Sequence, residues 1–386
     1  MPKVVLVNCE SYDYDQVKGS VQKGINLLGG PSAFAKPGEK ILLKPNWVVA
    51  VPPEKCVTTH PAVFRAVCEV FNDTGVNLTY GDSPSYQSPE VAAQKTGFAE
   101  VAAKLGIPMA DFRNGKEIFF QEALQNKKFT IANGVLECDG LISLPKLKTH
   151  GFLKLTGSVK NQFGCVPGLL KGEFHAKLPN PADFAKMLVD LNSFIKPRLY
   201  IMDGIIAMEG NGPMSGDPRK MNVLLFSADP IALDATVCRI INVNPEFSYT
   251  ITYGKEAGLG TYQENEIELL GESIKTFQAP DFKVNRDLQK NFSGRGKVAR
   301  LINNAIVSKP NISKNKCLKC GVCVNMCPVN PKAVDWHNKS DKSNPPSYKY
   351  NLCIRCYCCQ EVCPEGAIEL KKPFIRKLFS KHKWNG

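Results

Sequence analysis

Two copies of one cysteine pattern lie near the C-terminal end of the 386-residue chain. In each copy three cysteines are separated by two residues, a fourth follows after three more residues, and a proline comes next. The first copy runs from Cys317 to Pro328 and the second from Cys353 to Pro364. Three thiolates from one tight loop and a fourth from another direction can hold the corners of an iron–sulphur cube. The pattern therefore predicts two [4Fe–4S] clusters.

The two runs are expected to exchange their last ligands, because in two-cluster proteins the fourth cysteine of each run binds the other cluster. This gives two sets of four ligands: Cys317, Cys320, Cys323 and Cys363 for one cluster, and Cys353, Cys356, Cys359 and Cys327 for the other. Paired cysteines also bind zinc, but a zinc ribbon needs four of them and eight are present here. Cys358 is left over, and we interpret it as a small residue beside a cluster.

Residues 313–371 resemble the two-cluster bacterial ferredoxin family, since all eight ligand positions are filled. The resemblance implies a small α+β domain that transfers single electrons between partners and has no chemistry of its own.

The net charge of +13 is concentrated around this module. Residues 1–282 hold 28 basic and 30 acidic groups, whereas residues 283–316 hold nine basic groups and one acidic group, and residues 371–386 hold six basic groups and none that are acidic. Such segments favour an acidic redox partner. They are poor support for nucleic-acid binding, because the large N-terminal part is nearly neutral and has no recognition motif.

The basic segments set the expected domain organisation. We expect an α/β domain over 1–280, a basic helical linker over 281–312, the ferredoxin domain over 313–371 and a basic tail over 372–386. The helix in the linker is predicted from apolar residues at helical spacing: Val298, Leu301, Ile302, Ala305 and Ile306. The tail could touch a membrane surface or an acidic partner, or it could be solvated.

Composition places the chain among soluble globular proteins, with 43% hydrophobic and 22% charged residues. No apolar run approaches the roughly 18–20 residues of a membrane span, so no transmembrane segment is expected. The first residues lead directly into an apolar run and lack a signal-peptide pattern. We therefore expect a cytoplasmic protein.

Residues 1–280 alternate short apolar runs with helical patterns, which favours an α/β domain with a mostly parallel sheet flanked by helices. The predicted strands are Lys3–Cys9, Lys40–Lys44, Asn77–Gly81, Leu141–Leu144, Arg198–Met202 and Asn222–Phe226. The predicted helices are Tyr14–Leu28, His60–Asp73, Pro89–Leu105, Pro181–Phe194 and Pro230–Ile241. Neither a GxGxxG nor a Walker sequence is present, so the common nucleotide-binding classes lose support.

Ligands of open α/β sheets bind beyond the carboxyl ends of the strands, so the residues that follow the predicted strands are candidates for a site. We expect five of them to bind a cofactor or substrate: Lys44, Asn46, Asp82, Asp203 and Glu209. Asp82 and Asp229 have an alternative role of equal weight, since Asp before Ser-Pro or Pro often caps a helix. Glu209 opens a glycine-rich loop over residues 209–216 that would let the backbone approach a ligand closely or form an ordinary turn.

Residues 143–175 combine five lysines with glycines and amides, a composition that suits a phosphate or carboxylate. The candidate catalytic residues all lie in this stretch: Lys146, Lys148, His150, Lys160 and Asn161. A lysine with a lowered pKa, or His150, could also transfer protons. The alternative is a solvated basic loop.

Several short motifs in the N-terminal part resemble those of the uncharacterised iron–sulphur-centre proteins that are built on domain of unknown function number three hundred and sixty-two. They occupy residues 44–47, 58–61, 81–84, 144–150, 160–161 and 228–234. That family commonly joins this domain to a ferredoxin module, so the resemblance implies the architecture without a settled reaction. Residues 146–164 also show a faint likeness to a loop of nickel-pincer lactate racemases.

Together these patterns predict an iron–sulphur oxidoreductase in which electrons reach a small anionic substrate on the α/β domain. The alternatives are an electron carrier or maturation partner for another protein, and a non-redox isomerase or lyase with accessory clusters.

Overall fold

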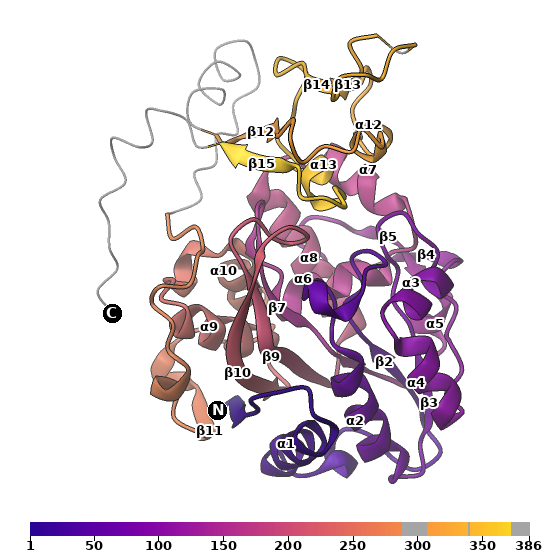
Figure 1. Cartoon of the computed structure of the whole chain (residues 1–386). Helices are drawn as coiled ribbons and strands as arrows, with labels where there is room; N and C mark the ends of the chain where they lie inside the picture. The colour runs from indigo at the N-terminus through magenta and orange to yellow at the C-terminus, as the bar shows by residue number, and fades with distance from the viewer. Residues whose placement is uncertain (288–306, 339, 372–386) are drawn as a thin grey trace.

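The computed structural model describes residues 1–287, 307–338 and 340–371 of the chain. Figure 1 shows a large α/β domain with a small C-terminal module seated at one end of it. The predicted linker helix and basic tail lie outside the described residues. Among the described helices, none is long and apolar enough to cross a membrane.

The large domain is built on one mixed sheet with the strand order β11-β1-β10-β9-β6-β2-β3, to which β7 and β8 are added beside β9. Strand β10 runs antiparallel to β1 and β9, and the other pairings along this order are parallel. The fold class predicted from the sequence is therefore confirmed. The strands are β1 (Lys3–Asn8), β2 (Lys40–Lys44), β3 (Asn77–Tyr80), β6 (Gly140–Ser143), β7 (Lys146–His150), β8 (Lys154–Leu155), β9 (Leu199–Glu209), β10 (Asp217–Ser227) and β11 (Glu268–Gly271).

Helices cover both faces of this sheet. Alternate residues of a strand point to opposite faces, and here both sets are apolar, so each face needs a covering layer. In β1, Val4 and Leu6 pack in one apolar cluster with Leu233, whereas Val5 and Val7 pack in another with Val21. The main helices are α1 (Tyr14–Leu27), α2 (Pro61–Asn72), α8 (Pro181–Ile195), α9 (Pro230–Ile240) and α10 (Tyr249–Glu256). Asp229 caps α9 by accepting from the backbone N–H groups of residues 231 and 232, both at 2.8 Å, which favours the capping role for this residue.

Two local expectations were wrong. The helix predicted over Pro89–Leu105 is two helices, α3 (Pro89–Lys95) and α4 (Phe98–Leu105), because Gly97 between them has a φ of +79°. Residues 146–150, expected as a loop, form β7. The predicted elements also lack the hairpin of β4 (Gly115–Phe119) and β5 (Lys128–Ala132), the strands β8 and β11, and four helices of the α/β domain: α5 (Asn133–Leu136), α6 (Gly157–Asn161), α7 (Leu170–Lys177) and α10.

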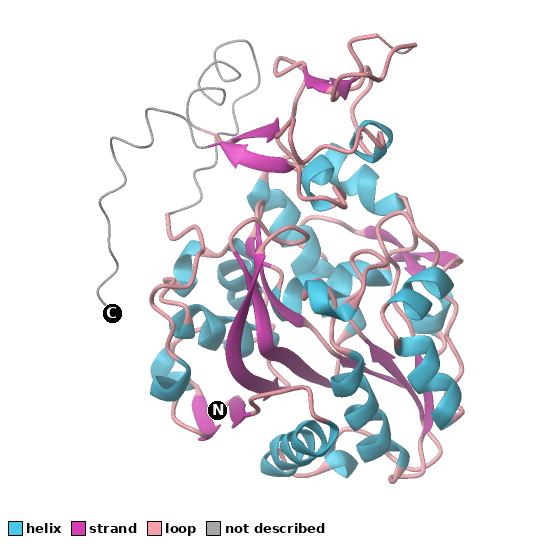
Figure 2. Cartoon of the chain, in the orientation of Figure 1, coloured by secondary structure: helices cyan, strands magenta, loops and turns pink. Residues whose placement is uncertain are grey.

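The small module has two short sheets and two single-turn helices (Figure 2). β12 (Lys309–Ile312) pairs antiparallel with β15 (Ile368–Lys371), and β13 (Val334–Asp335) pairs with β14 (Ser347–Tyr348). Helices α12 (Val322–Asn325) and α13 (Cys358–Glu361) each lie within a cysteine run. β12 falls inside the range that we assigned to the linker.

Strands β9 and β10 form a long hairpin whose tip reaches the module (Figures 1 and 2). Gln360 of the module donates from Nε2 to Asn211 Oδ1 at 3.0 Å and to the Gly212 carbonyl at 2.9 Å. Asn211 donates in turn to the carbonyl of Ile368 at 3.1 Å. Gly212 lies so close to β7 that a Cβ there would be 2.2 Å from the carbonyl oxygen of Thr149. The glycine-rich loop over 209–216, considered above for a ligand, thus holds the module instead.

Candidate functional site

A pocket lies at the carboxyl ends of the parallel strands and is closed by the module. It encloses about 690 Å³ of empty space, part of it open to solvent. The α/β domain provides most of its wall, and the module adds Met326, Cys358, Glu361 and Val362. Four of the ten predicted α/β site residues line it: Asn46, Asp82, Lys160 and Asn161.

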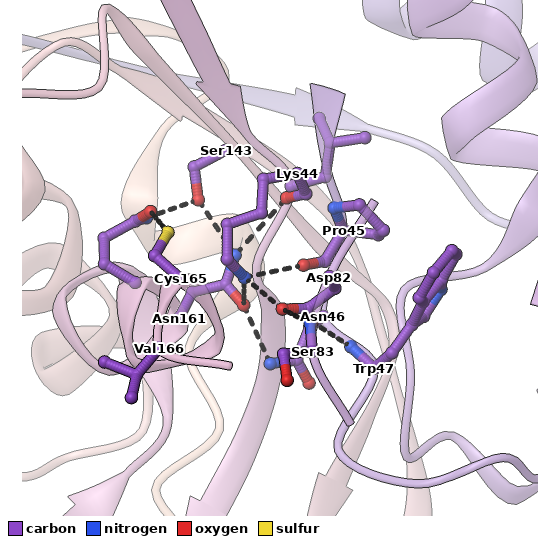
Figure 3. A network of polar contacts seen from close by, with 12 residues as sticks. Lys44, Pro45, Asn46, Trp47, Asp82, Ser83, Ser143, Asn161, Cys165 and Val166 are labelled. Atoms are coloured by element: carbon purple, nitrogen blue, oxygen red, sulfur yellow. Dashed lines mark hydrogen bonds and ion pairs between the residues drawn. The ribbon is translucent and has the colours of Figure 1, made fainter. Parts of the chain in front are cut away.

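One wall of the pocket is built on a buried ion pair (Figure 3). Lys44 is the last residue of β2, and Asp82 lies just beyond the end of β3. Lys44 Nζ is 2.8 Å from Asp82 Oδ1. Asp82 also accepts from the backbone N–H groups of Trp47, at 2.6 Å, and Ser83, at 2.9 Å. Helix α3 is capped by Ser88, so Asp82 is not a helix cap. Its contacts favour a role in holding the strand ends together.

Amide side chains extend this network to β6. Asn46 Nδ2 donates to Asn161 Oδ1 at 2.8 Å, and Asn161 Nδ2 donates to Ser143 Oγ at 2.9 Å (Figure 3). A Cβ on Gly164 would lie 1.8 Å from Asp82 Oδ1, so only glycine fits between the two layers. The glycine at position 164 is therefore explained by its close packing on the Lys44–Asp82 ion pair.

Asp234 sets the start of α6, the helix that carries Lys160 and Asn161. It accepts from the backbone N–H groups of Ser158 at 2.7 Å and Val159 at 3.2 Å. Burial raises the pKa of Asp234 to about 6. Gly157 has a φ of +57° and lies against this carboxylate, which is why the helix can begin there.

Lys171 and Ser83 form a second polar pair on the pocket wall. Lys171 Nζ lies 2.8 Å from Ser83 Oγ and 2.9 Å from the carbonyl of Val166. Burial lowers the pKa of Lys171 to about 7, and the nearby Asp82 only partly opposes this. Lys171 can therefore exchange a proton near neutral pH.

On the module side of the pocket, Glu361 contacts His150, the last residue of β7. His150 Nε2 lies 2.9 Å from Glu361 Oε1, and His150 Nδ1 accepts from the backbone N–H of Phe152 at 3.0 Å. Burial, with help from the positive charge of Lys160, lowers the pKa of His150 to about 4. Burial acts to raise the pKa of Glu361, but the close contact with His150 Nε2 and the positive charge of Lys160 outweigh it and lower that pKa. The pair at neutral pH is a neutral imidazole facing a carboxylate.

The other predicted α/β residues are not brought to the pocket lining. Lys146 Nζ lies 2.7 Å from Asp203 Oδ2 in a separate buried pair, which Tyr12 also contacts. Lys148 Nζ donates to the carbonyl of Val57 at 2.6 Å. Glu209 lies 3.4 Å from Lys283 Nζ, below the hairpin tip. These contacts give all four residues roles in packing that need no ligand.

In the module, one predicted ligand set surrounds a cavity. Cys317, Cys320, Cys323 and Cys363 line about 370 Å³ of empty space together with apolar side chains. Among the described residues, no three Cys, His, Asp or Glu side chains are close enough together to hold a single metal ion. These four cysteines thus face one common space, at the place where the sequence predicts one of the clusters.

The two cysteine runs have matching backbones. Lys319 and Gly321 in the first run, and Arg355 and Tyr357 in the second, all have positive φ between +58° and +77° at equivalent positions. The backbone N–H groups of Lys319, Ala333 and Ala367 point to cysteine sulphurs at 3.3–3.4 Å. Such donors stabilise thiolates and tune bound clusters. The residues present thus fit iron–sulphur ligation in both runs.

Several pocket residues were not chosen from the sequence. Lys171 and His175 lie in the stretch over 143–175 and could have been selected by their residue type. For Ser83 and Thr156, no sequence pattern indicates a place in the pocket. Glu361 lies between two ligand cysteines, and nothing in the sequence indicates that it faces the other domain.

The structure is that of an iron–sulphur protein in which a ferredoxin-type module closes a pocket on an α/β domain. Residues 316–367 match the 4Fe-4S dicluster domain, which supports iron–sulphur electron transfer and metal binding. Residues 41–239, about half of the chain, match the family described as Domain of unknown function (DUF362). The chain belongs to the DUF362 family, and the predicted fusion to a ferredoxin-type domain is confirmed.

One similar protein is the thylakoid-associated protein sll1697 of Synechocystis sp. It is 36% identical over 257 residues, which cover 66% of this chain and 79% of that protein.

Two solved structures show a fainter likeness. The lactate racemase apoprotein of Thermoanaerobacterium thermosaccharolyticum is 12% identical, with a TM-score of 0.41, and the match covers 62% of this chain and 57% of that one. A protein of Thermotoga maritima is also 12% identical, with a TM-score of 0.38, over 66% and 60% of the two chains. The chain spans less than two thirds of either structure, and similarity at this level carries no conclusion about chemistry.

Proposed function

We propose that the protein is an iron–sulphur oxidoreductase with two [4Fe–4S] clusters, which pass electrons to a small anionic substrate in the pocket. One cluster is assigned to Cys317, Cys320, Cys323 and Cys363, and the other to Cys353, Cys356, Cys359 and Cys327. When bound, these clusters supply one-electron transfer. We also keep a cytoplasmic location and an acidic redox partner as part of this proposal.

The observation that carries the proposal is the position of α13. This helix includes Cys359, one of the assigned ligands, and its neighbours Cys358, Glu361 and Val362 line the pocket. A ligand in the pocket would therefore contact the segment that binds the second cluster. A carrier without a substrate has no need for such a pocket between its two parts.

The side chains of the α/β domain supply binding and proton transfer. Lys160 offers an ammonium to an anion, and Asn161 is fixed by the Lys44–Asp82 network on the wall behind it. Lys171 can deliver a proton to a substrate that gains electrons, because the hydrogen bond to Ser83 holds its ammonium at the wall. The neutral His150 fixes Glu361 beside this site.

Reoxidation of the reduced protein tests the proposal. Protein purified anaerobically would be reduced with dithionite and mixed with a panel of small anions, while the cluster absorbance is followed. We expect at least one anion to speed reoxidation tenfold or more, and Lys160→Met to remove this effect without loss of the clusters. Lys104→Met, an exposed change on α4, serves as the control and should behave as the unmodified chain. Equal reoxidation rates with every anion would overturn the enzymatic assignment.

A carrier function is the second candidate, and one observation favours it. Leu318 is 68% exposed and stands between Cys317 and the exposed Cys320. Single exposed apolar side chains are common on protein surfaces, but this one lies beside two assigned cluster ligands, where a redox partner would have to dock. Isolation of a stable redox complex, together with a negative anion panel, would favour this candidate over the oxidoreductase.

A further inference from the structure

The ammonium group of Lys160 lines the pocket and has no direct ion-pair partner among the described residues. Lys160 is only 7% exposed, and the structure gives its Nζ no hydrogen bond or ion pair with any described residue. The ring of Phe163 lies 5.9 Å away and offers a weaker contact. A nearly buried ammonium without a hydrogen-bonding partner is costly, and a bound carboxylate would remove that cost.

Five buried polar atoms on the pocket wall have no hydrogen-bond partner in the part of the chain that the structure describes. They are Asn46 Oδ1, Trp47 Nε1, Thr156 Oγ1, His175 Nδ1 and Glu361 Oε1, the last of which faces His150. The hydroxyl and the imidazole can each donate to a carboxylate oxygen, and the amide oxygen can accept from a ligand hydroxyl or N–H. Buried polar groups are normally satisfied, so these atoms point to a polar ligand.

The rest of the lining is largely apolar, and it comes from both parts of the molecule. The apolar residues are Trp47, Val48, Phe163, Met326 and Val362. Ligand pockets typically combine such a wall with a few polar groups that fix the orientation of the ligand. A ligand that consisted only of a charged group would leave this wall in contact with water.

The charges around the pocket limit the ligand to one negative charge. Asp82 is paired with Lys44 and accepts from two backbone N–H groups, so this ion pair adds no net charge to the pocket. Lys160 and, when protonated, Lys171 line the pocket, and Glu361 on the module side is the one carboxylate of the lining without a lysine partner among the described residues. Two ammonium groups against one such carboxylate match a monoanion better than a dianionic phosphate.

We propose that the pocket binds a singly charged carboxylic acid with an apolar body, its carboxylate on Lys160, Thr156 and His175 and its body against Phe163 and the module. This inference names the class of substrate for the proposed function. It rests on the proposed function only for the claim that the bound acid receives electrons from the clusters.

Calorimetric titration of the oxidised, cluster-loaded protein tests the proposal with benzoate as the probe. Three comparison ligands test the charge, the apolar body and the number of charges separately. Benzamide has the shape of benzoate without its charge, acetate has the carboxylate without the apolar ring, and phthalate has a second carboxylate. Inorganic phosphate tests the competing anion class. We expect benzoate to bind at least tenfold more tightly than each of them. Binding of benzamide, phthalate or phosphate as tight as that of benzoate would overturn the proposal.

Variants assign the binding to this pocket. Lys160→Met should weaken benzoate at least tenfold, and Lys160→Arg should restore most of the affinity, while Lys104→Met should leave it unchanged. Unchanged cluster absorbance and circular dichroism show that each variant is folded. If Lys160→Met binds benzoate as tightly as the unmodified chain, the assignment is wrong.

The binding experiment involves no electron transfer, so its failure is separate from that of the proposed function. Benzoate binding without any anion-dependent reoxidation would overturn the oxidoreductase and keep the ligand class. Reoxidation by an inorganic anion, with no benzoate binding, would do the reverse.

Discussion

The α/β domain and the ferredoxin module are held together by different physical means. The α/β domain has two extensive apolar clusters, one on each face of its sheet, and two buried ion pairs, Lys44–Asp82 and Lys146–Asp203, lie inside the fold. The described part of the module has one small cluster of seven buried residues, three of which are cysteines. Apolar packing therefore stabilises the fold of the α/β domain, whereas the fold of the module depends on its cysteines binding clusters.

The largest effect should come from removal of a cluster ligand. Cys353→Ser should abolish one cluster and, because so small a core cannot support about 60 residues alone, remove hydrogen-exchange protection from residues 307–371. Protection in residues 1–287 should persist. Cys358→Ser changes a neighbouring buried thiol that is not an assigned ligand, and it should leave both clusters in place. Protection of the module that survives Cys353→Ser would show that packing alone holds it.

A broken ion pair should destabilise the α/β domain strongly without unfolding it. Lys44→Met leaves the Asp82 carboxylate buried without its cation, which typically costs about 3–5 kcal/mol. Urea denaturation followed by circular dichroism measures this loss. The double variant Lys44→Met/Asp82→Asn removes the stranded charge and should recover a large part of it. No recovery would mean that packing of the lysine chain, and not its charge, is what the domain needs.

The contact between the two regions should have an intermediate effect. Gln360→Ala removes the hydrogen bonds to Asn211 and Gly212 and leaves these buried acceptors without a partner, which typically costs about 1–3 kcal/mol. We expect faster hydrogen exchange in residues 209–216, while the core strands stay protected. Gln121→Ala, an exposed change in the α/β domain, is the matched control. Unchanged exchange at the hairpin tip would show that other contacts hold the module.

The smallest effect should be the pH dependence due to Lys171. Burial lowers its pKa to about 7 from an ordinary value of 10.5, so between these values the unfolded chain binds a proton that the folded chain does not. Stability should therefore rise with pH across this window, by about 1 kcal/mol for a group that keeps some exposure. Urea midpoints of the unmodified chain and Lys171→Met, compared from pH 6 to 9, isolate this contribution. Equal slopes would show that Lys171 keeps its ordinary pKa.

The sequence was most informative where spacing alone defines the chemistry. The two cysteine runs predicted the module, and apolar alternation predicted the sheet and most of its helices. Asn46 and Asp82 were chosen because they follow strands whose carboxyl ends share one edge, and Lys160 and Asn161 because their stretch is rich in lysines and amides. The structure brings all four to one pocket.

The remaining errors come from register and from contacts between distant segments. Lys146 and Lys148 were grouped with the site, but β7 pairs with β9 through an irregular register that places Lys146 opposite Asp203. No local pattern records such a register. Glu361 was missed because its role depends on how the module sits on the hairpin tip, which the spacing of its neighbouring cysteines does not determine.

The long β9–β10 hairpin has a kinetic consequence. Because its tip holds the module by direct contacts, the separation between the second cysteine run and the pocket is set by the α/β domain and not by the length of the chain between residues 287 and 307. Under the proposed function, donor and acceptor would share one molecule, and an electron would move between them without a diffusional encounter. Such a step would be first order, so its rate constant would be the same in dilute and in concentrated protein.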